Sequence, residues 1–170
     1  MSRTITTSVA LGLGTLALAG CPEPPPPLPC EGPEDPQLSL SNRRETSDLG
    51  QQGVVEVFPP PQGGVFAELD VVIRSMALEE LEYLRVVVES IPAGEEYANV
   101  RYFGDSIPLI CAEQGPGQEW LEVANMPVGF TEMYQLDEFD GRPAKVTGII
   151  ETAAGEFPVE YDVTLVRTEY

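Results

Sequence analysis

The feature that most constrains the fold is a strict alternation of apolar and polar residues in two segments. In residues 65–74 every odd position is apolar, and the even positions include two acids and an arginine. In residues 157–166 every odd position is apolar or aromatic, and the even positions include Glu160 and Asp162. Successive side chains of a strand point to opposite faces, so each segment has one apolar face. The alternation predicts half-buried β-strands.

Six more segments are typical of strands: residues 54–58, 81–90, 97–103, 107–112, 119–124 and 145–152. Turns rich in glycine and proline separate them, and Ala153-Ala-Gly-Glu has the length of a hairpin loop before residue 157. Helix is expected only in short pieces, at residues 77–82 and in one turn within 130–139. Such a pattern predicts an all-β, antiparallel sandwich of the immunoglobulin-like or fibronectin-III-like kind over residues 53–170.

Two turns in this region, Gln62-Gly-Gly and Asp140-Gly-Arg-Pro, resemble those of small immunoglobulin-like domains in uncharacterised bacterial lipoproteins. The region lacks the Cys…Trp…Cys core pattern of antibody domains. The resemblance therefore implies a fold and no particular activity.

Residues 1–20 have the pattern of an export signal. Residues 1–8 are polar and carry one positive charge, Arg3, and residues 9–19 are apolar. Eleven residues make a helix of about 16 Å, too short for a hydrocarbon core of about 30 Å. We therefore expect a secretory signal peptide and not a transmembrane anchor.

The motif Leu18-Ala19-Gly20-Cys21 resembles the lipobox of bacterial lipoproteins. The resemblance implies that Cys21 carries a diacylglycerol thioether, that the signal is cut before it, and that its new amino group is acylated. Several acyl chains hold a protein stably on a bilayer. Because Pro22 follows the cysteine where an aspartate would favour the inner membrane, the resemblance implies a lipid anchor in the outer membrane. The alternative is an ordinary cysteine after an ordinary signal.

Residues 21–52 are expected to be a lipidated, proline-rich linker. Residues 22–36 contain eight of the seventeen prolines, which excludes a helix or a central strand. Such a disordered stalk favours polyproline II and is interpreted as a semi-rigid spacer, the alternative being a PxxP ligand for an aromatic groove. Residues 37–52 are polar, with one short strand expected around residues 38–41.

Cys30 and Cys111 remain once Cys21 is lipidated, and an exported protein with an even number of cysteines favours a disulfide. The loop of about 80 residues would contribute roughly 4–5 kcal/mol in the loop-entropy model. The alternative is a pair of free thiols, with Cys111 a buried apolar residue.

Composition excludes several classes of function. The chain has no histidine, so catalysis by Ser-His-Asp or Cys-His is excluded, as are imidazole metal sites. A net charge of -19 disfavours nucleic acid and anionic lipid surfaces as partners. Lys145 is the single lysine, and no Ser-x-x-Lys motif precedes it.

Two sets of residues are candidates for a ligand site. Asp137, Glu138 and Asp140 cluster near a turn and are weak candidates for calcium, the alternative being a solvated acidic turn. The aromatic candidates for a face that binds a sugar or a peptide are Trp120, Tyr102, Tyr97, Phe103 and Tyr134, with Trp120 and Tyr102 foremost.

The sequence thus predicts a lipid-anchored protein of the cell envelope, facing the periplasm or the cell surface, that acts as a non-catalytic interaction or structural module. Its partner would be an envelope protein or a glycan. A calcium- or glycan-binding module is the first alternative. A hydrolase that uses paired carboxylates, such as those near Glu79 and Glu95, is the second.

Overall fold

The computed structural model describes residues 30, 35–61, 63–113, 119–131 and 135–169. The predicted signal peptide, the predicted lipobox with Cys21, and the proline tract up to residue 29 lie outside the described residues. Gln62, Glu132 and Tyr134 lie outside them as well.

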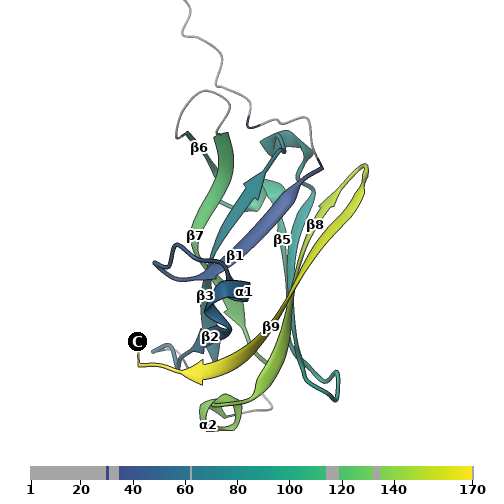
Figure 1. The fold of residues 1–170 in the computed structure, drawn as a ribbon. Helices are drawn as coiled ribbons and strands as arrows, with labels where there is room; N and C mark the ends of the chain where they lie inside the picture. Colours follow the sequence, from purple (N-terminus) through teal and green to yellow (C-terminus); the bar gives the residue numbers. More distant parts are fainter. Residues whose placement is uncertain (1–29, 31–34, 62, 114–118, 132–134, 170) are drawn as a thin grey trace, which may run out of the picture.

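The described residues form two β-sheets that pack face to face (Figure 1). Sheet A has the order β1 (Gln37–Asn42), β3 (Phe66–Arg74), β7 (Glu119–Gly129) and β6 (Ile110–Glu113). Sheet B has the order β2 (Val54–Val57), β9 (Gly155–Arg167), β8 (Pro143–Thr152), β4 (Tyr83–Ser90) and β5 (Glu96–Phe103).

These two orders confirm the predicted all-β, immunoglobulin-like sandwich. When the strands are lettered in the order of the chain, the neighbours β1-β3-β7-β6 in sheet A correspond to A-B-E-D of an immunoglobulin domain. The neighbours β9-β8-β4-β5 in sheet B correspond to G-F-C-C′ of a variable-type domain. One pair of strands differs from the expected antiparallel arrangement: β2 runs parallel to β9. The chain leaves sheet A after β1, makes the single turn of α1 (Leu49–Gln52), and joins the edge of sheet B at Val54.

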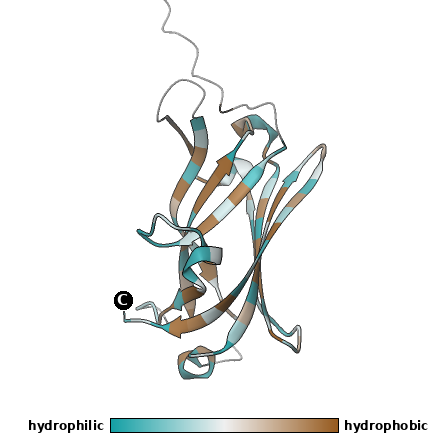
Figure 2. Ribbon diagram, in the orientation of Figure 1, coloured by the Kyte–Doolittle hydropathy of each residue, from teal (hydrophilic) through white to brown (hydrophobic). Residues whose placement is uncertain are grey.

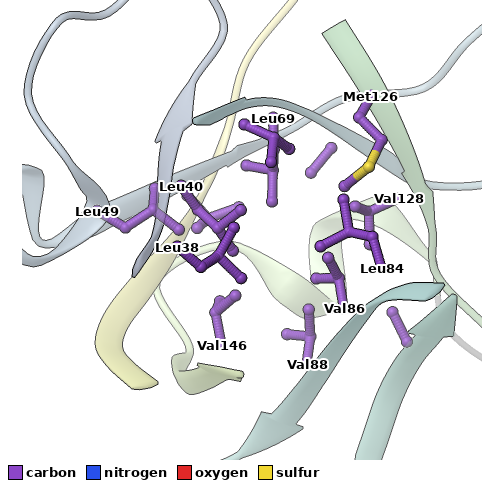
Figure 3. Close-up of a cluster of buried hydrophobic side chains, with 14 of the residues drawn as sticks. Leu38, Leu40, Leu49, Leu69, Leu84, Val86, Val88, Met126, Val128 and Val146 are labelled. Atoms are coloured by element: carbon purple, nitrogen blue, oxygen red, sulfur yellow. The ribbon is translucent and has the colours of Figure 1, made fainter. Parts of the chain in front are cut away.

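Alternation of side chains builds the core between the sheets, as the hydropathy colouring of the strands shows (Figure 2). In β3 the residues that alternation assigned to the apolar face are buried, among them Leu69, Val71 and Ile73. Side chains of sheet A, such as Leu40 and Val128, meet those of sheet B, such as Val86 (Figure 3).

Gly148 allows a close approach of the two sheets. A Cβ atom on Gly148 of β8 would lie 2.7 Å from Leu38 Cδ2 and 3.0 Å from Leu40 Cδ1. Two leucines of β1 therefore pack directly on the backbone of sheet B.

Residues 37–52 are part of the sandwich, so the linker ends earlier than the sequence predicted. β1 pairs with β3 from Gln37↔Arg74 to Asn42↔Leu69, and Leu49 of α1 is fully buried. The short strand expected around residues 38–41 is thus one strand of sheet A. Only two leucines mark it in an otherwise polar stretch, which is why its hydrophobic pattern indicated a linker.

In the part of the chain that the structure describes, helix is confined to short turns, as predicted. A 3-10 turn occupies Leu78–Glu80 within the first expected segment, and α2 (Leu136–Phe139) occupies the second. A further 3-10 turn, Gly104–Ser106, follows β5. Phe139 of α2 is fully buried, and its ring packs edge-on against Tyr97 and Phe130.

A disulfide joins Cys30 to Cys111 of β6, with a Cα–Cα distance of 6.1 Å. Cys30 is 3% exposed, and its carbonyl accepts a hydrogen bond from the Met76 amide just after β3. The bridge thus fastens the segment before β1 to the opposite edge of sheet A. We call this end of the sandwich, where β6 and the β8–β9 turn also lie, the tether end (Figure 1).

Candidate functional site

Among the predicted aromatic residues, the four that the structure describes do not form one face, so the prediction was wrong for them. Trp120 lies on β7 in sheet A, whereas Tyr102 and Phe103 lie on β5 in sheet B. Tyr97 is buried in the core. The Tyr102 hydroxyl donates a hydrogen bond to the Pro127 carbonyl, and burial raises the pKa of this phenol.

The three carboxylates proposed for calcium each contact another part of the chain. Asp137 forms an ion pair with the Arg167 guanidinium, and Asp140 accepts a hydrogen bond of 2.9 Å from the Arg167 amide. Glu138 accepts one of 2.8 Å from the Gln135 amide, which caps α2. Within the described part of the chain, no group of three or more acids or cysteines is arranged to hold a metal ion.

A different site is present on the outer face of sheet A. A shallow groove of about 590 Å³ crosses β1, β3 and β7 and is bounded by the turn after β1; we call it the sheet A groove. Trp120 lines it together with its cross-strand partner Arg74. Hydroxyl groups line it as well, from Ser39 and Ser41 of β1 and from Thr46 and Ser47 of the turn.

Three side chains on the groove's floor interact. The Arg74 guanidinium lies over the Trp120 ring, 5.1 Å from the ring centroid, in a cation–π arrangement. The indole N–H donates a hydrogen bond of 2.8 Å to Glu122 Oε2. Arg74 forms no ion pair with any described residue, although the chain is strongly acidic. Its N–H donors thus face the groove beside an aromatic ring.

The backbone at one end of the groove is irregular, and Asp70 holds it. The pairing of β3 with β7 shifts between Leu69 and Val71, so that Ala124 and Asn125 form a bulge in β7 opposite Asp70. The Asp70 carboxylate accepts hydrogen bonds from the amides of Arg44, at 3.0 Å, and Asn125, at 2.7 Å. Arg44 and Asn125 have φ angles of 65° and 56°. One carboxylate therefore stabilises two left-handed residues.

A third left-handed residue stands at the other end of the groove. Ser75 has a φ angle of 58° and directly follows Arg74. Among the described residues, Arg44, Ser75 and Asn125 are the non-glycine residues with positive φ, and all three flank the groove or its lining. Strained backbone of this kind costs about 1–3 kcal/mol at each residue and clusters at functional sites. The groove is thus the strongest candidate site of the described chain.

Sequence reasoning selected Trp120 but missed Arg74, Glu122 and Asp70. Alternation in residues 65–74 placed Asp70 and Arg74 on the polar face. The pairing of Arg74 with Trp120 depends on the register between β3 and β7, and the bulge shifts that register. Residues before and after a bulge cannot be aligned from periodicity alone.

Comparison with known proteins adds little to this description. No family model and no curated protein matches the chain. Among solved structures, the CooA pilin subunit from enterotoxigenic Escherichia coli is similar, with a TM-score of 0.40 and 9% sequence identity over 78% of this chain and 98% of that chain. The strand orders of the two sheets, and not this likeness, define the fold. Within the described residues no helix is long and apolar enough to cross a bilayer.

Proposed function

We propose that the protein is a lipid-anchored, non-catalytic interaction module of the bacterial cell envelope, held to the outer membrane through Cys21. The lipobox supports the anchor, and the sandwich supplies the module. The observation that carries the proposal is the Cys30–Cys111 disulfide, which joins the segment after Cys21 covalently to the folded domain.

With a lipid on Cys21, the disulfide would limit how far the domain can stand from the bilayer. Cys30 lies nine positions after Cys21, and nine residues of fully extended chain span at most about 30 Å. Without the bridge the free chain would extend to Gln37, and sixteen residues span at most about 55 Å. In the proposed anchored protein, the bridge would keep the tether end toward the membrane and leave the opposite end of the sandwich accessible to a partner.

A binding role also agrees with the hydrogen bonds that carboxylates of the sheet A groove accept from the protein itself. Asp70 binds two backbone amides, Glu122 binds the Trp120 indole, and Asp48 caps α1 by accepting a hydrogen bond of 2.9 Å from the Gln51 amide. Carboxylates that hold the fold in this way are suited to shaping a contact surface. A glycosidase instead needs two carboxyl groups facing one bond of the substrate.

Detergent phase partition tests the anchor. The whole protein, expressed in a bacterium that processes lipoproteins, is expected in the detergent phase. Cys21→Ala should move it to the aqueous phase, because no acyl chain can be attached. The double change Cys30→Ser with Cys111→Ser is the matched control and should stay in the detergent phase. Wild-type protein in the aqueous phase would contradict the proposal.

A further inference from the structure

Two rows of outward side chains cross the sheet A groove in register. The first row runs Gln37–Arg74–Trp120–Ala112 across the four strands, and the second runs Ser39–Val72–Glu122–Ile110. The large side chains, Arg74 and Trp120, stand side by side in the middle of the first row. The second row places the small Ser39 and Val72 next to them. An aromatic ring thus borders a shallow, polar hollow.

The groups around this hollow match those of a sugar. The faces of a pyranose ring present C–H bonds, which pack against the electron-rich face of an indole. Its hydroxyls both donate and accept, and the lining offers partners of both kinds: carboxylates that accept, the Arg74 guanidinium that donates, and serine and threonine hydroxyls that do either.

The charge of the lining restricts the class of sugar. Four carboxylates line the groove, those of Glu45, Asp48, Asp70 and Glu122, against one cation, Arg74. An acidic sugar would meet a net negative field, in a protein whose net charge is -19. A neutral sugar avoids this repulsion and still satisfies the hydrogen-bonding groups.

From this arrangement we infer that the sheet A groove is a binding site for a neutral glycan. The exposed Arg74 guanidinium moves off the Trp120 ring to donate hydrogen bonds to the sugar, which frees that ring face as the stacking platform, and Ser39 is a further hydrogen-bonding neighbour. The strained residues at both ends of the groove hold its shape before a ligand arrives. The groove runs along the outer face of sheet A, from the tether end, where Trp120 pairs with Ala112 beside Cys111, to the turn after β1. The inference does not depend on the lipid anchor, since binding can be measured in detergent solution.

The chain's single tryptophan makes the site directly observable. In the whole, detergent-solubilised protein, emission from Trp120 reports on this groove and on no other place. We expect it to change saturably on titration with millimolar neutral oligosaccharides from a panel of β-1,4-glucose, α-1,4-glucose and N-acetylglucosamine oligomers. An oligogalacturonate should bind at least about tenfold more weakly. A lysine-rich peptide tests the acidic lining as a site for a basic protein partner.

Variants assign the binding to the groove. By calorimetry, Trp120→Ala should weaken the best neutral ligand about tenfold or more, and Trp120→Phe should retain part of the affinity. Arg74→Ala should weaken it severalfold. Arg85→Ala is the matched control, because Arg85 lies on the outer face of β4 in the other sheet, and it should leave binding unchanged. Thermal unfolding measured by circular dichroism shows whether each variant is folded.

The inference is overturned if no neutral oligosaccharide in the panel changes the emission, or if the oligogalacturonate binds as well as the neutral ligands. It is also overturned if only the lysine-rich peptide binds, or if folded Trp120→Ala binds like the wild type. None of these results affects the detergent partition of the protein, so the glycan site and the lipid anchor are tested independently.

Discussion

The β8–β9 hairpin and the β3–β7 pair are both antiparallel, yet they are built differently. β8 and β9 pair without interruption from Pro143↔Thr164 to Thr152↔Gly155, and the Lys145–Glu160 ion pair of 2.8 Å crosses their outer face. The β3–β7 pair is bulged opposite Asp70, and its outer face carries the sheet A groove.

The comparison shows that the irregular pair needs side-chain interactions that the regular hairpin does not need. Backbone hydrogen bonds and alternation are sufficient for the hairpin. The β3–β7 pair needs in addition a specific carboxylate, Asp70, to bind two left-handed residues. Local departures from regular structure that persist in a folded protein are expected at functional sites.

The largest expected effect is that of the disulfide, which lies on the β3–β7 side of the molecule. The double change Cys30→Ser with Cys111→Ser should lower the free energy of unfolding by about 4 kcal/mol in the loop-entropy model. Chemical denaturation measures the loss, and reduced wild-type protein should match the variant. Hydrogen exchange should increase in β6 and β7 before it increases in β8 and β9. Equal increases in hydrogen exchange in β6–β7 and in β8–β9 would contradict the idea that the disulfide stabilises one side of the molecule more than the other.

Asp70→Ala tests whether a single carboxylate holds the irregular pair. We expect the free energy of unfolding to fall by about 2 kcal/mol, because two charge-assisted hydrogen bonds to left-handed residues are lost. Asp162→Ala is the matched control: it removes an exposed carboxylate from the outer face of β9, and its effect should be within about 0.5 kcal/mol. The comparison fails if the two variants unfold at the same denaturant concentration.

Tyr161 connects the hairpin to β1, the edge strand of sheet A that pairs with β3, since its hydroxyl accepts a hydrogen bond of 3.3 Å from the Leu40 amide. Tyr161→Phe should cost about 1 kcal/mol, because that buried amide loses its acceptor. Fluorescence- or dichroism-monitored denaturation gives the value. A variant as stable as the wild type would show that the bond does not join the sheets.

Alkaline pH gives a second test of the same residue. Burial raises the pKa of the Tyr161 phenol, against the opposing effect of its hydrogen bonds with Leu40 and Ser39. A raised pKa gives stability that is present below the unfolded value of about 10 and is lost as pH rises through the folded value. The wild type should therefore lose stability above pH 10 more steeply than Tyr161→Phe. Parallel decline of the two proteins would contradict this assignment.

The smallest effect is expected on the regular hairpin. Lys145 and Glu160 are both well exposed, and hydrogen bonding to Glu160 followed by its charge raises the pKa of the Lys145 ammonium. Exposed pairs contribute little to folding. Lys145→Ala should leave the denaturation midpoint unchanged within error. A clear shift would mean that the hairpin also depends on specific side chains.

Most of the fold could be predicted from the sequence, because alternation is a local signal. Each of the eight segments proposed as strands between residues 54 and 166 overlaps one strand of the structure. β7 runs five residues beyond the predicted end at Ala124, because the bulge at Ala124 and Asn125 interrupts its alternation. The parallel pairing of β2 with β9 depends on contacts more than 100 residues apart, which no local pattern encodes.

The candidate site was predicted only in part for the same reason. Trp120 was selected by its residue type. Its neighbours Arg74 and Glu122 are common residues whose significance comes from register alone. Tyr102 was grouped with Trp120 by type, although the strands that carry them belong to different sheets.

One mass measurement tests the central claim, that an acylated tether is bonded covalently to the end of this sandwich. Trypsin applied without reduction to the envelope-purified protein should release residues 21–43 joined to residues 102–145, since Arg142 precedes a proline and resists cleavage. We predict one linked species that carries acyl mass on the peptide containing Cys21. Separate peptides, or a linked pair with an unmodified Cys21 or a retained signal, would contradict the account.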